Sequence, residues 1–360
     1  MSLIPGPRPV HVMQSPIDAG SAPDVLAALA RALDGSGPCI CIGSAAPADT
    51  VASEIAVILH TSGSTGRPRP VGLTAAQLTA LTSHVHDGVT PQWISSLPWS
   101  AAGGLNVAVR SLATPHGLIL VPPSHPFDPH TILDALATAA GPVFLSLVPM
   151  QLSRILDTNP QALAHCHRIL IGGASMSTML RERSAHLPIV QTYGMTETAG
   201  GCVFNGTPAP GVGIDIDDGR VVVTGVTVAA GYLDTDQEFH GRFATQDLGT
   251  FDDGRLTVTG RIDDVVLVRG TNVSLSAVAD ALGTSDACVV ALPDDVDGAV
   301  ICAAFTGMTD AQVETHLDAV VARLGHSARP RRTRIVASLP LLHTGKIDRH
   351  AVQRMFEEGR

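Results

Sequence analysis

The chain has 360 residues, of which 45% are hydrophobic and 16% are charged, and its formal net charge is −10. This length and composition are typical of a globular protein large enough for two domains. The acidic balance and an aromatic content of 3% argue against binding to nucleic acid, and no apolar run reaches the roughly 18 residues that an integral membrane helix needs.

The first half of the chain predicts alternating strands and helices. The segment 22–34 has the apolar spacing of a helix and ends at a glycine. The apolar run 54–60 is typical of a buried strand; it leads into a loop rich in Gly, Ser and Pro (61–70), after which Thr74 and Gln77 form the capping box of a helix. Further strands are expected at 117–122, 141–149, 167–174 and 187–198, and helices at 130–140 and 150–157. This alternation predicts a largely parallel sheet with helices on its faces.

From about residue 211 the pattern changes twice. Short strands at 219–225 and 254–261 are bounded by Asp-Asp-Gly turns, which indicates a β-rich stretch. After "GRIDD" (260–264), two helices alternate with three strands, and Thr309 and Gln312 form the capping box of the second helix. We therefore predict an α/β protein. A large N-terminal domain (1–262) has mixed and parallel sheets, flanking helices and a β-rich subdomain, and a small α+β domain (263–360) follows.

The six cysteines form no CxxC pair, so neither a zinc site nor a disulfide framework is predicted. Cys39 and Cys41 lie two residues apart in an apolar segment, where core packing is a better interpretation than metal binding. The N-terminal residues lack the basic segment of a signal peptide. We expect the protein in the cytoplasm.

The segment 61–66, "TSGSTG", follows the buried strand 54–60 and combines hydroxyl groups with glycines. Small residues let a backbone curl around an anion, and hydroxyls add donors. The pattern differs from a Walker A loop, because no G-x-x-x-x-G-K-[ST] is present. We predict a phosphate-binding loop; the alternative is a flexible surface turn. The donors would be Thr61, Ser62, Ser64 and Thr65 through their hydroxyls and Gly63 and Gly66 through their amides.

The stretch "QTYGMTET" (191–198) ends another predicted strand. Tyr193 is suited to lie against a nucleobase, and Thr196 is suited to reach a phosphate. Glu197 offers the oxygen ligand that Mg²⁺ prefers. Alone this motif is weak, because Tyr and Thr end many strands.

Two further stretches suit a nucleoside. The glycines of "GGA" (172–174) permit close approach of the backbone to a flat ligand. Asp247 and Arg261 lie on either side of a predicted turn, and a carboxylate beside a guanidinium suits a ribose diol. The alternative for Asp247 and Arg261 is a plain surface salt bridge.

Three of these motifs, together with a fourth near the C-terminus, resemble the adenylate-forming enzymes, which include acyl-CoA synthetases, adenylation domains of peptide synthetases and luciferases. The motifs are "HTSGSTGRPRP" (60–70), "TYGMTET" (192–198), "TQDLG…GRIDD" (245–264) and "TGKIDR" (344–349), and they occur in the family's order and rough spacing. The resemblance runs from about residue 54 to the C-terminus. It implies ATP and Mg²⁺ as cofactors, CoA as co-substrate and a mobile C-terminal domain.

The resemblance also implies a role for each matching residue. The loop from Thr61 to Gly66 handles the β- and γ-phosphates, assisted by Arg69. The adenine is framed by Gly172, Gly173, Ala174, Tyr193 and Gly194; Thr196 contacts the α-phosphate, Glu197 holds Mg²⁺, and Asp247 and Arg261 bind the ribose. Lys346, the chain's one lysine, matches the mobile catalytic lysine, Asp263 the hinge, and Gly270 the loop that lines the CoA channel.

The sequence departs from the family pattern in three places and in length. Arg69 stands where the family usually has lysine, His60 where it has an aromatic residue, and Arg269-Gly270 where it has a glycine pair. The chain is also shorter at its N-terminus than typical members.

The stretch "SSLPWSAAGGLNVAVRSL" (95–112) resembles the o-succinylbenzoate–CoA ligases of menaquinone biosynthesis, through its Leu-Pro pair, its glycine pair and Arg110. Arg110 is the one charged residue of the stretch and should have an anionic partner. We expect it to hold the non-reacting carboxylate of the acid, with Gly104, Ser175 and Thr198 nearby; the alternative is a structural salt bridge.

The expected activity is ATP-dependent ligation of o-succinylbenzoate to CoA through an acyl-adenylate. The alternatives are a ligase for another aryl or acyl acid, a stand-alone adenylation enzyme that loads a carrier protein, and a non-catalytic nucleotide-binding module. A homodimer is an open possibility. One basic cluster is expected either to bind CoA phosphates or to be a solvated strand edge: Arg329, Arg331, Arg332 and Arg334.

Overall fold

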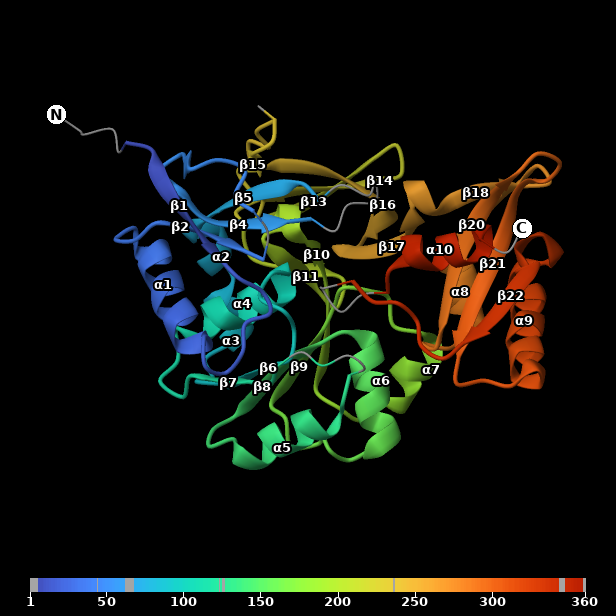
Figure 1. The fold of residues 1–360 in the computed structure, drawn as a ribbon, viewed down its shortest axis with the longest axis horizontal. Helices are drawn as coiled ribbons and strands as arrows, with labels where there is room; N and C mark the ends of the chain where they lie inside the picture. Colours follow the sequence, from blue (N-terminus) through green and yellow to red (C-terminus); the bar gives the residue numbers. More distant parts are fainter. Residues whose placement is uncertain are drawn as a thin grey trace.

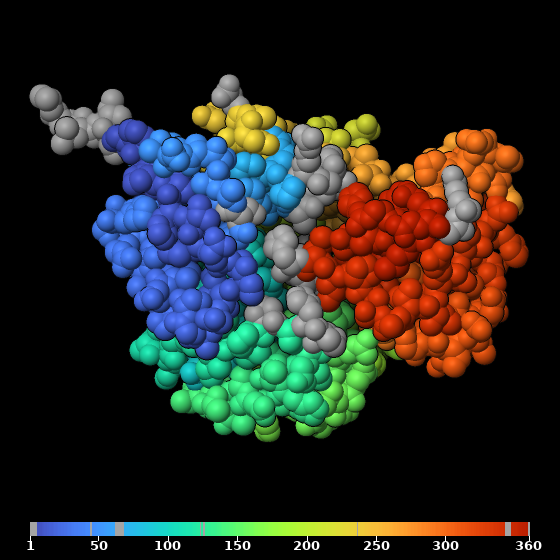
Figure 2. Space-filling view, in the orientation of Figure 1, coloured from blue at the N-terminus to red at the C-terminus, as the bar shows by residue number. Residues whose placement is uncertain are grey.

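The computed structural model describes residues 6–43, 45–61, 68–122, 124, 127–235, 237–342 and 347–358. Within these residues, three sheets and seven α-helices occupy the N-terminal part, and the C-terminal part forms a smaller lobe at one end of the molecule (Figure 1). The space-filling view shows this lobe, coloured orange to red, packed beside the N-terminal part (Figure 2). None of the helices in the described part of the chain has the length and apolar character needed to span a bilayer.

The first sheet is mixed, with the strand order β15-β5-β4-β2-β1-β3. Its strands are β1 (Arg8–Met13), β2 (Cys39–Ile42), β3 (Thr50–Val51), β4 (Ile55–His60), β5 (Pro70–Thr74) and β15 (Gly231–Tyr232). β4 and β5 are antiparallel neighbours, with His60 opposite Pro70. The predicted unit of strand, loop and helix is therefore wrong: the Gly/Ser loop connects two paired strands. The short apolar run "VGLT" after Pro70 forms β5 because β4 and β15 both pair with it.

The second sheet confirms the predicted parallel arrangement. It has the order β12-β11-β10-β9-β8-β6-β7, and β7, β6, β8, β9 and β10 are parallel. Its strands are β6 (Gln92–Ser95), β7 (Leu118–Leu120), β8 (Val143–Leu147), β9 (Arg168–Ile171), β10 (Ile189–Met195), β11 (Gly200–Phe204) and β12 (Thr207–Pro208). Gln191 lies opposite Ile171, so the segments that follow β9 and β10 meet at one edge of the sheet.

Seven helices flank these two sheets. They are α1 (Ala22–Asp34), α2 (Ala75–Thr79), α3 (Thr82–His86), α4 (Ala102–Ser111), α5 (His130–Thr138), α6 (Pro149–Thr158) and α7 (Thr178–Arg183). The capping box predicted at Thr74 is confirmed, with both reciprocal hydrogen bonds to Gln77. The sequence did not predict α4, because its residues from Gly104 to Ser111 are all buried and therefore show no amphipathic period.

The N-terminal strand is tied to the first helix by a buried cation. Arg8 is 8% exposed, and its guanidinium donates to the carbonyl oxygens of Gly37 (2.9 Å), Ala32 (2.6 Å) and Ile55 (3.1 Å). These acceptors lie at the end of α1 and at the start of β4. A cation there satisfies orphan carbonyls and opposes the negative end of the helix dipole.

The third sheet confirms the predicted β-rich stretch. It has the order β13-β14-β16-β17, and all neighbouring strands are antiparallel. Its strands are β13 (Val212–Asp217), β14 (Arg220–Gly225), β16 (Arg242–Asp252) and β17 (Arg255–Arg261). The two hairpin turns place Asp218-Gly219 and Asp253-Gly254 at positive φ, as a type I′ turn requires. The β16–β17 register sets Asp247 opposite Arg261.

The C-terminal part consists of a hairpin, a three-stranded sheet and three α-helices. The elements are β18 (Val265–Val268), β19 (Thr271–Ser274), α8 (Leu275–Leu282), β20 (Ala287–Asp294), β21 (Gly298–Thr306), α9 (Asp310–Leu324), β22 (Arg332–Val336) and α10 (Arg349–Glu357). Among the described residues, each buried apolar cluster contains either side chains up to Leu256 or side chains from Val266 onward, but not both. The domain boundary at residues 262 and 263 stays a proposal.

Candidate active site

The carboxyl ends of β9 and β10 bring two of the predicted segments together. Residues 172–174 follow β9, and a short 3₁₀ helix, η1 (Thr196–Thr198), follows β10. Ligands of α/β sheets bind at such strand ends. The glycines are required by close packing: a Cβ on Gly172 would lie 2.4 Å from the hydroxyl oxygen of Thr192, and one on Gly194 would lie 2.0 Å from the carbonyl oxygen of Gly200.

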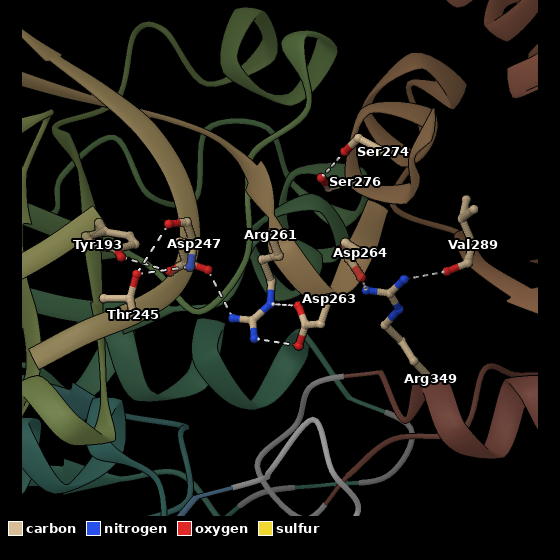
Figure 3. Close-up of polar contacts among 10 residues, drawn as sticks. All are labelled: Tyr193, Thr245, Asp247, Arg261, Asp263, Asp264, Ser274, Ser276, Val289 and Arg349. Atoms are coloured by element: carbon tan, nitrogen blue, oxygen red, sulfur yellow. Dashed lines mark hydrogen bonds and ion pairs between the residues drawn. The ribbon is translucent and has the colours of Figure 1, made fainter. Parts of the chain in front are cut away.

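One carboxylate joins the third sheet to β10. The Tyr193 hydroxyl donates to Asp247 Oδ2 (2.8 Å), and Arg261 Nη1 donates to Asp247 Oδ1 (3.0 Å). Arg261 also donates through Nε and Nη2 to the two oxygens of Asp263, at 2.8 Å and 3.0 Å. Figure 3 shows these four residues in a row that runs from β10 to the start of the C-terminal part. One residue predicted for the adenine, the two predicted for the ribose and the predicted hinge residue are therefore one connected group.

Burial distinguishes the contacts of Asp247 with Tyr193 and Arg261 from a surface salt bridge, because Asp247 is only 7% exposed. Burial and the neighbouring Asp247 carboxylate raise the pKa of Tyr193. The hydrogen bonds to Asp263, with the charge of Asp247, raise the pKa of Arg261. Tyr193 is therefore a neutral donor and Arg261 a fixed cation at neutral pH. The arrangement keeps one carboxylate oriented for a hydroxyl-bearing ligand.

Glu197 lies in η1 with its carboxylate partly engaged. Tyr232 donates its hydroxyl to Glu197 Oε1 (2.8 Å), and Oε2 accepts no hydrogen bond from a described residue. The described residues contain no group of three or more His, Cys, Asp or Glu side chains that could hold a metal. Mg²⁺ is usually bound through one or two carboxylates, water and substrate phosphates rather than by a protein cage. A single carboxylate with one available oxygen therefore fits a nucleotide-bound Mg²⁺.

Arg69 closes the base of the predicted phosphate loop. Its backbone amide donates to Thr61 Oγ1 (3.2 Å), and the Thr61 amide donates to the Arg69 carbonyl oxygen (2.9 Å). Its guanidinium contacts Asp234 and Thr235, and the bond to Asp234 raises the pKa of Arg69. The other predicted loop residues lie outside the described residues: Ser62, Gly63, Ser64, Thr65 and Gly66.

Arg110 lies on α4, is 5% exposed, and has its Nε buried without a partner. No hydrogen bond or ion pair of its guanidinium joins it to another described residue. Burial lowers the pKa of Arg110 to about 10, so the side chain is still cationic at neutral pH. A structural salt bridge, the alternative for Arg110, is not found in the described part of the chain. A buried cation of this kind is a place for an anionic ligand.

The other three residues expected near the acid have structural roles in these surroundings. Thr198 is fully buried and its hydroxyl donates to the Gly200 carbonyl oxygen (2.9 Å), so it stabilises the turn after η1. Ser175 donates to Asp280 of α8 (3.2 Å) and contacts the C-terminal part. A Cβ on Gly104 would lie 2.2 Å from the Pro98 carbonyl oxygen, so glycine lets α4 pack on that segment.

Sequence reasoning missed two residues that hold Glu197 in place. Asn106 of α4 is buried, and its amide donates to the carbonyl oxygens of Ala199 (2.7 Å) and Ala102 (2.8 Å). Tyr232, one of two tyrosines in the chain, donates to Glu197. Asn106 could have been noticed in the sequence, because it is a lone amide in the apolar run before Arg110. The contact of Tyr232 with Glu197 could not, because it depends on the pairing of β15 with β5.

The proposed hinge lies in a short 3₁₀ helix between the N-terminal part and the C-terminal part. Asp263 lies in the 3₁₀ helix η2 (Ile262–Asp264), between β17 and β18. Its neighbour Asp264 accepts from Arg349 of α10 (2.6 Å). Lys346 lies outside the described residues, and Leu341 and Ile347 form a bridge with each other.

The C-terminal basic residues and the proposed CoA loop have partners within the protein. Arg269 and Gly270 both have positive φ at the tip of the β18–β19 hairpin, and Arg269 pairs with Asp297 (2.9 Å). In the basic cluster, Arg329 pairs with Glu314, Arg331 with Asp297, and Arg332 donates to the Phe356 carbonyl oxygen. These contacts favour the alternative of a solvated strand edge for that cluster.

Comparison with known proteins gives two family matches and close relatives. Residues 9–233 match the family described as AMP-binding enzyme, and residues 276–346 match the AMP-binding enzyme C-terminal domain. A probable 2-succinylbenzoate–CoA ligase of Mycobacterium tuberculosis is 35% identical over 94% of this chain and 97% of its own length. A 2-succinylbenzoate–CoA ligase of Listeria monocytogenes is 28% identical over 84% of this chain and 70% of its own length.

Solved structures agree on the fold. The amide bond synthetase McbA of Marinactinospora thermotolerans has a TM-score of 0.72 at 25% identity and covers 96% of this chain and 80% of its own. The o-succinylbenzoate CoA synthetase MenE of Bacillus subtilis, in complex with the acyl-adenylate OSB-AMP, has a TM-score of 0.72 at 21% identity, with 90% and 80% covered.

The two tyrosines provide a pH test of the site. Burial raises the pKa of both phenols, so the stability they contribute is complete below the unfolded pKa of about 10 and is lost as the pH rises towards the folded values. In an alkaline titration we expect the ultraviolet absorbance of phenolate to appear only together with loss of the circular dichroism signal. A phenolate signal of one tyrosine at about pH 10 in folded protein would contradict this arrangement.

Proposed function

The chain belongs to the AMP-binding enzyme family, and from that premise we propose that it is an ATP-dependent acid–CoA ligase acting on o-succinylbenzoate. The products are o-succinylbenzoyl-CoA, AMP and pyrophosphate, as menaquinone biosynthesis requires. The extent of the similarity to the mycobacterial ligase, which is matched over nearly its whole length, supports this assignment. A cytoplasmic location and a homodimer stay predictions.

The observation that carries the choice of acid is the buried Arg110. Asn106 and Arg110 are four residues apart on α4, so their side chains lie on one face about 6 Å apart. Asn106 contacts the backbone just after Glu197. An acid with two carboxylates can therefore place one near Glu197 and Thr196 and the other on Arg110. The charge of that second carboxylate would neutralise the buried guanidinium.

The first step joins an anion to a polyanion. A carboxylate oxygen of the acid attacks the α-phosphorus, and the bond from that phosphorus to pyrophosphate breaks. Catalysis of such a transfer is mostly positioning and neutralisation of charge. Glu197 would hold Mg²⁺, which would supply neutralisation of charge at the leaving phosphates. In this proposal Asp247 and Arg261 hold the ribose, Thr196 contacts the α-phosphate, and Lys346 brings a compact cation to the two reacting anions.

The second step transfers the acyl group to sulfur. The thiol of CoA loses its proton and forms a bond to the acyl carbon, while the bond from that carbon to the AMP oxygen breaks. We propose that rotation about Asp263 withdraws Lys346 and brings the hairpin tip at Gly270 to the site. Arg261 contacts both Asp247 and Asp263, so one side chain contacts both the ribose site and the hinge.

The function is tested by product identification. Purified protein is incubated with o-succinylbenzoate, ATP, Mg²⁺ and CoA, and the thioester and AMP are measured by mass spectrometry. We expect both products in equal amounts. Acyl transfer only to a carrier protein would favour the stand-alone adenylation enzyme, and absence of AMP with every acid would favour a nucleotide-binding module.

Replacement of Arg110 tests the acid site. We expect Arg110→Met to raise the KM for o-succinylbenzoate by about 10- to 100-fold, because a hydrogen bond to a charged group is lost. Steady-state kinetics should show no such increase for an analogue in which hydrogen replaces the non-reacting carboxylate. Arg181→Met, at an exposed arginine of α7, is the control. An equal effect of Arg110→Met on both acids would contradict the assignment of Arg110 to the non-reacting carboxylate.

Replacement of Lys346 separates the two steps. We expect Lys346→Ala to reduce acyl-AMP formation by at least about 100-fold, since a cation in contact with the reacting groups is removed. Thioester formation from pre-made acyl-AMP should stay within a few-fold of the wild type. Lys346→Arg should also be poor, because a broad guanidinium replaces a compact ammonium. Equal loss of both steps would show that the lysine is not specific to adenylation.

A further inference from the structure

Glu197 is held by the segment that leads into β15. The Ala229 amide donates to the Glu197 carbonyl oxygen (2.9 Å), and the Tyr232 hydroxyl donates to Glu197 Oε1 (2.8 Å). Gln77 of α2 fixes the same segment by donating to the Val228 carbonyl oxygen (2.6 Å). Both the backbone and the side chain of Glu197 are therefore oriented by protein groups.

The ring of Tyr232 is itself fixed on several sides. The guanidinium carbon of Arg69 lies 3.4 Å from the ring centroid, and the Phe239 ring packs against Tyr232 at an interplanar angle of 89° with centroids 4.9 Å apart. The backbone of Tyr232 pairs with Val71 of β5. Because the ring cannot tilt freely, the direction of its hydroxyl is set.

Arg69 needs the geometry of a guanidinium to hold the Tyr232 ring in place. Its Nε and Nη2 contact the two oxygens of Asp234 at 3.3 Å and 3.1 Å, and Nη2 also donates to Thr235 (3.2 Å). The edge of the guanidinium is thus used for hydrogen bonds while its face covers the Tyr232 ring. A lysine ammonium cannot stack and form paired hydrogen bonds at once.

We propose that Tyr232 is a positioning residue for Glu197, and that Arg69 acts through the Tyr232 ring to direct Oε2 of Glu197 towards a Mg²⁺ ion carried by the nucleotide. The inference rests on the proposed function. Mg²⁺ demands near-ideal octahedral geometry, and groups that hydrogen-bond to a metal ligand commonly set its orientation and the metal affinity. With Oε1 held by the phenol, Oε2 is presented in one direction.

The test compares metal-dependent with metal-free nucleotide binding in Tyr232→Phe, which removes one hydroxyl. Binding of a non-hydrolysable ATP analogue is measured by calorimetry over a range of Mg²⁺ concentrations, and binding of AMP is measured without metal. We expect the Mg²⁺ concentration for half-maximal binding to rise about tenfold, as for other partners of metal ligands. AMP affinity should stay within about twofold, and excess Mg²⁺ should restore binding of the analogue.

Two matched variants complete the experiment. Tyr193→Phe makes the same chemical change beside Asp247, and it should weaken AMP binding while leaving the Mg²⁺ requirement unchanged. Arg69→Lys keeps Tyr232 and the charge but not the stacking, and it should shift the Mg²⁺ requirement in the same direction as Tyr232→Phe by a smaller factor. Circular dichroism confirms that each variant is folded; if Tyr232→Phe is not, Arg69→Lys decides.

An unchanged Mg²⁺ requirement in Tyr232→Phe, or an equal loss of AMP and analogue binding, would overturn the proposal. The readout uses no acid and no CoA. Failure here is therefore distinguishable from failure of the acid assignment, which product identification tests separately.

Discussion

A positive charge buried without an anion beside it is unfavourable, because the protein interior solvates it less well than water does. Arg110 carries such a charge on α4, and its burial lowers its pKa. Burial of this guanidinium costs free energy in the ligand-free protein, and a bound carboxylate would remove that cost. We propose that the location of this charge limits which acids the site can bind.

The helix that carries Arg110 also holds the turn that carries Glu197. Asn106 bonds the backbone after η1, and Gly104 lets α4 pack against the segment at Pro98. In the third sheet, Arg261 links Asp247 to Asp263 at the start of the C-terminal part. The proposed acid site, nucleotide site and hinge are thus connected by short sets of contacts. Such connections suit the proposed reaction, whose two steps use two arrangements of the domains.

Much of this could be predicted from the sequence where a local rule applies. The parallel strands, the Asp-Gly turns and the capping boxes at Thr74 and Thr309 follow from periodicity and side-chain chemistry over a few residues. The strand β5 and the helix α4 could not be predicted in this way, because their burial depends on neighbours distant in the chain. For the same reason the sequence did not indicate that Tyr232 would meet Glu197 or that Ser175 would meet Asp280.

The most direct test of the role of Arg110 is the free energy of unfolding of ligand-free Arg110→Met, measured with denaturant beside the wild type. If the cation awaits a ligand, replacing it with an apolar side chain of similar length removes a desolvation cost, and the variant should be as stable as the wild type or more stable by about 1 kcal/mol or more. A loss of roughly 3 kcal/mol or more, the amount expected when a buried ion pair is broken, would contradict the account, since it would show that Arg110 serves the fold.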